Sequence, residues 1–99
     1  MSKKVKWTQR AKASLNTYCA HIAADSPSSA ERVRQTITTT SRLLSQNPNL
    51  FQLDEYYPDN PGNIRRFFKW SYKVVYLVEE DEVIILEIYH TSQFPKKIS

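Results

Sequence analysis

Basic side chains and one histidine gather in the C-terminal third of the sequence, in the segment RRFFKWSYKVVYLVEEDEVIILEIYH. Arg66, Lys69 and Lys73 precede the acidic residues 79–82, and His90 ends the segment. Lysine and arginine bind anions such as phosphates and carboxylates, and arginine can stabilise charge that develops during a reaction. Imidazole is the side chain best suited to proton transfer near neutral pH. These residue types could therefore bind an anion and move a proton beside it.

The elements that position these residues follow from hydrophobic periodicity and from capping and breaking residues. Thr8 can cap a first helix, and Asp25-Ser26-Pro27 breaks the chain and begins a second one. The sequence predicts a strand at residues 5–7 and helices at residues 8–24 and 27–46. An irregular segment at residues 49–63 follows, and then three strands at residues 64–69, 72–79 and 82–90. We therefore expect one α+β domain over residues 1–99. In it a short N-terminal strand precedes an antiparallel helical hairpin, which packs on a small antiparallel sheet completed by a three-stranded meander.

Strand alternation predicts which residues of the meander face the helices, because one parity of each strand is buried. Ile84, Leu86 and Ile88 form the clearest apolar row. His90 has the same parity, so it either caps this row or serves a functional site.

The predicted meander also brings the cations together at one end of the sheet. If the first hairpin turns near residues 69–71, Arg66 lies across from about Lys73. The cationic group would consist of Arg66, Lys69, Lys73, His90, Lys96 and Lys97, with the acidic residues 79–82 at the opposite end. Such a group could hold phosphates or carboxylates. The alternative is that edge cations only prevent sheets from pairing with one another.

Composition narrows the class of protein. The chain has 99 residues and a net charge of +4, which suits an anionic partner. A single glycine argues against a phosphate-cradling loop, and a single cysteine, Cys19, permits no intrachain disulfide. The sequence shows no apolar signal segment, and its longest aliphatic run, 83–86, is far too short to span a membrane. We expect a cytoplasmic protein that does not bind membranes.

Three segments together resemble a known family. They are VKWTQRAKASL at residues 5–15, DSPSSA at 25–30 and IRRFFKWSYKVVYLVEEDEVIILEIYHTSQFP at 64–95. In this order the segments resemble the RelE/ParE superfamily of toxins from type II toxin–antitoxin systems. The resemblance covers about residues 5–97.

The resemblance implies a growth-inhibiting toxin that a cognate antitoxin neutralises. It implies no metal ion and no cofactor. RelE-like members cleave mRNA in the ribosomal A site, whereas ParE-like members inhibit DNA gyrase. The sequence places ribosome-dependent mRNA cleavage first and gyrase inhibition as the alternative. A third hypothesis is a degenerate toxin that only binds its antitoxin.

Site residues follow from the same resemblance. The expected catalytic residues are Arg66, Lys73 and His90, and the expected substrate-binding residues are Arg65, Lys69, Tyr72, Gln93 and Lys96. Lys73 stands where the family commonly has arginine, so it keeps the charge but loses the bidentate fork. Gln93 or Ser92 stands where many members have a catalytic arginine, which weakens the case for a nuclease. Glu55 is either a general base from the loop or a solvated carboxylate.

Overall fold

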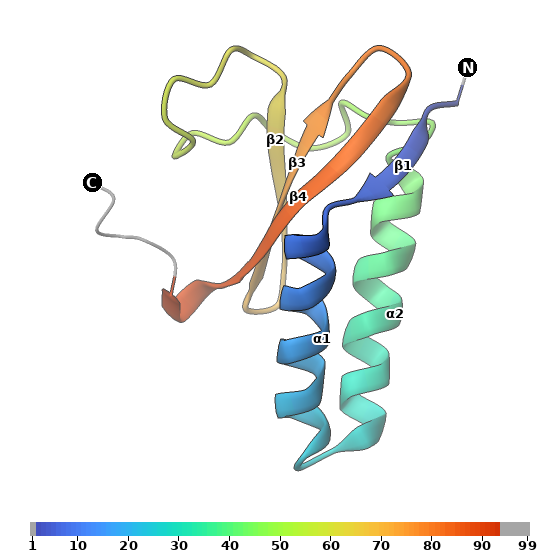
Figure 1. Cartoon of the computed structure of the whole chain (residues 1–99), viewed down its shortest axis with the longest axis vertical. Coiled ribbons are helices and arrows are strands. Elements are labelled where there is room, and N and C mark those ends of the chain that lie inside the picture. The colour runs from blue at the N-terminus through green and yellow to red at the C-terminus, as the bar shows by residue number, and fades with distance from the viewer. Residues whose placement is uncertain (1, 94–99) are drawn as a thin grey trace.

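A helical hairpin and a four-stranded sheet make up the protein (Figure 1). The computed structural model describes residues 2–93. The elements are β1 (Lys4–Trp7), α1 (Gln9–Ala23), α2 (Pro27–Leu43), β2 (Ile64–Lys69), β3 (Tyr72–Val78), β4 (Glu82–His90) and the 3-10 turn η1 (Thr91–Gln93). The predicted α+β fold class and the predicted order of elements are confirmed.

Both helices begin at the residues that the sequence marks as caps. The hydroxyl of Thr8 accepts a hydrogen bond from the backbone N–H of Ala11 at 3.0 Å, and that of Ser26 accepts one from Ser29 at 3.3 Å. Pro27 occupies the first position of α2, where its missing N–H costs nothing. The second helix ends at Leu43, a few residues before the expected boundary.

The sheet is mixed rather than wholly antiparallel. Its strand order is β1-β4-β3-β2, and the three meander strands pair antiparallel as expected. The N-terminal strand β1 instead lies parallel to β4, from Lys4 opposite Glu82 to Trp7 opposite Ile85. The expectation of an antiparallel sheet is therefore wrong at this strand, because the residue pattern of a short strand does not reveal the direction of its partner.

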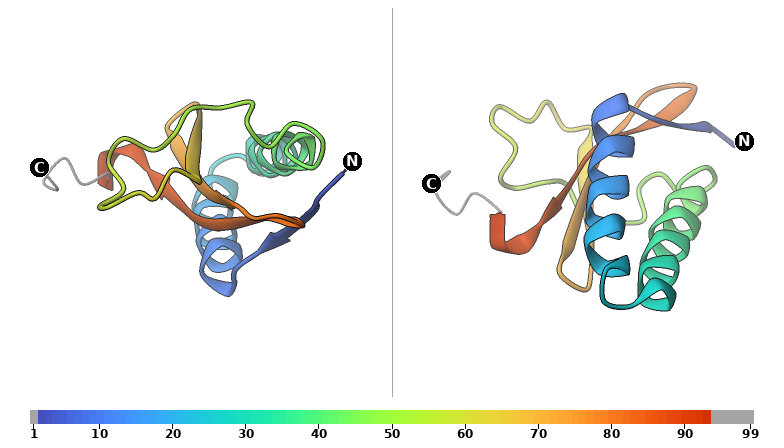
Figure 2. Two further views of the ribbon diagram at one scale, coloured as in Figure 1. Left: turned by 90° about the horizontal axis from the view of Figure 1, so that it is seen from above. Right: turned by 60° about the horizontal axis from the view of Figure 1, so that its bottom comes forward.

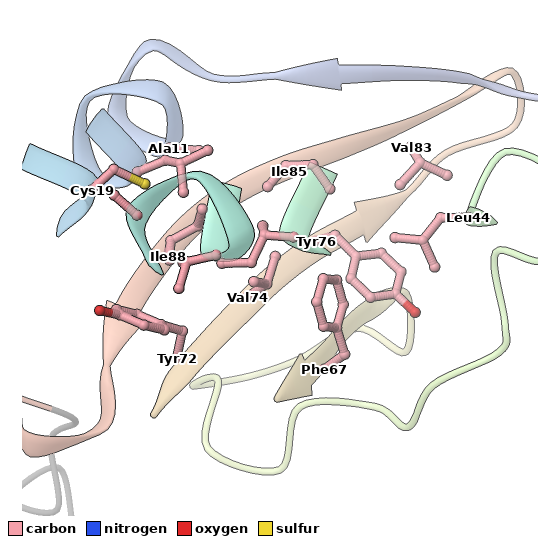
Figure 3. Close-up of a cluster of buried hydrophobic side chains, with 14 residues drawn as sticks. Ala11, Cys19, Leu44, Phe67, Tyr72, Val74, Tyr76, Val83, Ile85 and Ile88 are labelled. Atoms are coloured by element: carbon pink, nitrogen blue, oxygen red, sulfur yellow. The ribbon is translucent and has the colours of Figure 1, made fainter. Parts of the chain in front are cut away.

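A β-bulge in β4 changes which residues are buried. Val75 and Tyr76 are consecutive on β3, yet they pair with Glu87 and Ile85, so Leu86 is an extra residue on β4. The β4 residues buried in the core, drawn in Figure 3, are Val83, Ile85 and Ile88. The expected row of Ile84, Leu86 and Ile88 is therefore wrong except for Ile88. A strict two-residue alternation does not reveal the extra residue of a bulge, and that residue reverses the buried parity beyond it.

The two faces of the sheet are covered by different parts of the chain (Figure 2). The hairpin packs on one face through α1, which contacts both α2 and β4. The segment 44–63 runs back along β2, where the N–H of Arg66 donates to Gln52 at 3.1 Å and the N–H of Asp54 donates to Ile64 at 2.9 Å. It then reaches the side of the strands away from the helices. We call these sides the helix face and the loop face.

Within residues 2–93, neither helix combines the length and the apolar character that crossing a membrane requires.

The bulge predicts unequal effects of two neighbouring substitutions. Ile85→Ala should destabilise the protein by about 2–5 kcal/mol, because Ile85 is fully buried. Ile84→Ala is the matched control and should cost clearly less, since Ile84 is only half-buried. Urea unfolding monitored by circular dichroism measures both. A larger cost at Ile84 would contradict the observed register.

Candidate functional site

The loop face is organised around a lysine buried in the middle of the sheet. Lys73 on β3 lies between Phe68 of β2 and Tyr89 of β4. Its side chain is only 2% exposed, and its Nζ lies 3.0 Å from Oδ1 of Asp54. The ring of Tyr56, also from the loop, lies 5.3 Å from the same ammonium group. Lys73 therefore ties the loop to the sheet, and its charge is neutralised within the protein.

Arg66 lies on the same face and makes a second connection to the loop. Its Nε and Nη2 each donate to Glu55 at 3.0 Å, and Nη2 also donates to the side chain of Gln52 at 3.0 Å. Its guanidinium carbon lies 5.0 Å from the centre of the Phe68 ring. The hydrogen bond from Arg66 lowers the pKa of Glu55, which favours a carboxylate over a group that accepts protons near pH 7.

His90 lies on the opposite face of the sheet. It pairs with Tyr72, whose ring it meets edge-on at 5.2 Å, and its ring centre is 6.2 Å from that of Tyr18 on α1. Its Nδ1 accepts the backbone N–H of Ser92 at 3.2 Å and lies 2.8 Å from the Ser92 hydroxyl. His90 thus packs beside Tyr72 and Tyr18 on the helix face, which fits one of the two roles expected for it, and its functional role stays a prediction.

The expected convergence of Arg66, Lys73 and His90 is therefore wrong. The pairing places Arg66 opposite Val75 and not opposite Lys73. Two of the three residues point to the loop face and the third points to the helix face. The reason is strand alternation, since Lys73 and Tyr72 are neighbours on β3 and His90 pairs with Tyr72.

The expected substrate-binding residues on β2 and β3 do different things in the fold. Arg65 donates from Nη1 to the backbone oxygen of Phe51 at 2.6 Å, and so helps to hold the loop. Tyr72 is a buried core residue, and burial raises its pKa. Lys69 is exposed, and its ammonium lies 5.8 Å from the centre of the Trp70 ring. Of these three residues, Lys69 is the one whose charge faces solvent.

Two further expected residues lie at the end of the described chain. Gln93 is the last residue of η1. Lys96, together with Lys97, lies outside the described residues. Their expected roles remain predictions.

A hollow of about 420 Å³ lies beside the buried ion pair on the loop face. Its lining includes apolar side chains, three tyrosines and two ion pairs: Val75, Leu86, Tyr56, Tyr57, Tyr89, Lys73–Asp54 and Arg10–Glu87. The Nε of Arg10 lies 2.9 Å from Oε2 of Glu87. Both cations that line the hollow are thus paired with carboxylates.

Sequence reasoning missed Asp54, the partner of Lys73. The sequence held only a weak signal for it, because a lysine in a strand is usually exposed even beside valines, and only a buried lysine requires a carboxylate. Asp54 and Glu55 are the carboxylates of the nearby loop. The pattern could not show which of them turns inward.

The ion pair predicts strong coupling between two substitutions. Lys73→Met and Asp54→Leu should each destabilise the protein by about 3–5 kcal/mol, because each leaves one buried charge without its partner. The double variant should be far more stable than the sum of the two losses predicts. Urea unfolding of the four proteins gives the coupling energy. Additive losses would show that the pair is not an energetic unit.

Comparisons with known proteins find a similar fold in solved structures and a matching protein family. A sequence model described as the ParE toxin of type II toxin–antitoxin systems, parDE, matches residues 5–95. The chromosomal ParDE toxin–antitoxin system from P. aeruginosa contains a similar chain, with a TM-score of 0.70 and 24% sequence identity. The similarity covers 90% of this chain and 96% of that one. The toxin–antitoxin complex RelBE2 from Mycobacterium tuberculosis gives a TM-score of 0.61 at 16% identity, over 91% and 99% of the two chains.

A search of curated proteins found no significant match. The two solved structures establish the fold, whereas the sequence model spans nearly the whole chain and establishes the family. The expected resemblance to the RelE/ParE superfamily is confirmed, and the chain belongs to the family of ParE toxins of type II toxin–antitoxin systems.

Proposed function

We propose that this toxin arrests growth by binding and inhibiting DNA gyrase, and that a cognate antitoxin neutralises it. One observation carries the choice of target. The three residues expected to cleave RNA lie on two faces of the sheet, and Lys73 is neutralised by Asp54. This placement favours a toxin that acts by binding.

Chemistry explains why the placement matters. Metal-free RNA cleavage needs a base, an acid and cations around a single phosphate. Arg66 is held by two hydrogen bonds to Glu55, and Lys73 is buried. Cleavage would require the loop to release both cations and would still leave His90 on the other face. A toxin that only binds a protein needs none of these changes.

An antitoxin partner is supported by family membership and by charge. Both similar solved structures are described as toxin–antitoxin assemblies. The net charge of +4 suits a partner with acidic residues. An acidic segment that packs over the hairpin and the sheet would satisfy both observations.

Two purified assays distinguish the targets. The wild-type toxin should inhibit DNA supercoiling by gyrase and leave translation in a cell-free extract unchanged. Loss of translation together with new mRNA 5′ ends on stalled ribosomes, while gyrase stays active, would instead establish RNA cleavage. If the protein affects neither assay but binds the product of its neighbouring gene, it is a toxin that retains only antitoxin binding.

Substitution of His90 provides an independent prediction. His90→Ala should still arrest growth, because the histidine packs beside Tyr72 and Tyr18 and has no chemical step to perform. A general acid or base would behave differently, since its loss slows a reaction about 10²–10⁴-fold. Growth after induction, with circular dichroism to verify folding, is the measurement. A folded variant that no longer arrests growth would favour the nuclease.

A further inference from the structure

The turn between β2 and β3 carries two exposed aromatic side chains, Phe68 and Trp70; we call its residues Phe68, Lys69 and Trp70 the hairpin end, in which Phe68 and Lys69 lie on opposite faces of the sheet. Phe68 is 45% exposed and Trp70 is 54% exposed. Lys69 is also exposed and lies over the Trp70 ring. Large aromatic side chains on a small soluble domain are usually buried, so their exposure here calls for an explanation.

The backbone at Trp70 is the second observation. Its φ is +52°, in the left-handed region that glycine and asparagine adopt readily and that a bulky residue adopts at a cost. Trp70 stands in a two-residue connection between the paired residues Lys69 and Tyr72, where glycine is favoured. A tryptophan at this position therefore weakens the fold locally. Strain of this kind is typically retained where a side chain serves a function.

The hairpin end is also held in place. Tyr72, directly after the turn, is buried in the core. The backbone N–H of Thr91 donates to the oxygen of Ser71 at 2.7 Å and so fastens the turn to η1. Rings on a fixed turn lose little conformational freedom on binding, which strengthens an interface.

The chemistry of the surface points to a protein partner. Tryptophan beside a cation is typical of the residues that dominate binding energy at protein interfaces. Of the four cations on β2 and β3, Arg65, Arg66 and Lys73 are engaged by the loop, which leaves Lys69 as the one that faces solvent. A complementary surface would offer an apolar slot for the Trp70 ring and a carboxylate for Lys69.

We propose that Trp70, with Lys69 over its ring, is the anchor with which the toxin binds gyrase, at an apolar slot that has carboxylates on its rim. This inference rests on the proposed function. It adds the surface that makes the contact.

Trp70→Gly tests the anchor without endangering the fold. Glycine relieves the left-handed backbone, so the melting temperature should rise by several degrees. The concentration for half-inhibition of supercoiling should rise about thirtyfold or more, as expected for loss of a dominant interface residue. Leu43→Ala is the matched control, because Leu43 is 50% exposed on α2, outside the hairpin end. It should inhibit gyrase like the wild type.

The outcomes separate the two proposals. A wild-type toxin that does not inhibit gyrase refutes the proposed function. If the wild type inhibits and Trp70→Gly inhibits equally well, the anchor is refuted and the function stands. If Trp70→Gly instead loses binding to the antitoxin, the hairpin end belongs to that partner and the inference is overturned.

A direct probe uses the toxin's own tryptophan. The chain has two tryptophans, so Trp7→Phe leaves Trp70 as the single site for 5-fluorotryptophan labelling. Its ¹⁹F chemical shift should change when gyrase is added, because the shift reports the surroundings of the Trp70 ring, whereas broadening alone would report binding at any surface of the toxin. The inference fails if gyrase leaves the resonance unchanged. It also fails if the resonance responds instead to a single-stranded oligonucleotide or to the concentration of the toxin alone.

Discussion

The buried ion pair between Lys73 and Asp54 determines how the loop face is built. A lysine in the middle of a sheet, 2% exposed, is tolerated only with a carboxylate beside it. The carboxylate comes from the loop between α2 and β2, so that loop must lie across the strands. Once Asp54 is in place, its neighbours Glu55 and Tyr56 reach Arg66 and Lys73. One pairing requirement therefore positions the segment that covers this side of the sheet.

The same requirement limits the chemistry available on this face. A cation that neutralises an internal carboxylate cannot also neutralise a phosphate unless the ion pair separates. Separation costs free energy, because it leaves two charges without partners in the protein interior or requires both to move into solvent. Arg66 is restrained in the same manner by its two hydrogen bonds to Glu55. Both carboxylates come from one loop, so a single structural feature withdraws both cations from catalysis.

The sequence predicted local structure well and the relations between strands less well. Caps at Thr8 and Ser26 and the apolar spacing fix the helices, and the meander boundaries follow from β-rich runs between turns. The buried row of β4 could not be predicted, because the bulge at Leu86 depends on pairing with β3. The prediction of a single cationic site was wrong for a related reason. Sequence distance placed the cations near one end of the sheet, but the face of each side chain depends on register, and the partner of Lys73 comes from an irregular loop.

The distribution of cations also explains why binding would concentrate at the hairpin end. Of the four cations on β2 and β3, three are bound to oxygens of the loop: Arg65, Arg66 and Lys73. Lys69 is the last residue of β2, and its ammonium group instead lies over the Trp70 ring at the turn. A fixed turn that presents a strained tryptophan beside this lysine offers a partner both apolar area and charge at little entropic cost. The loop that binds the other three cations of β2 and β3 therefore supports the proposal that this sheet serves recognition rather than catalysis.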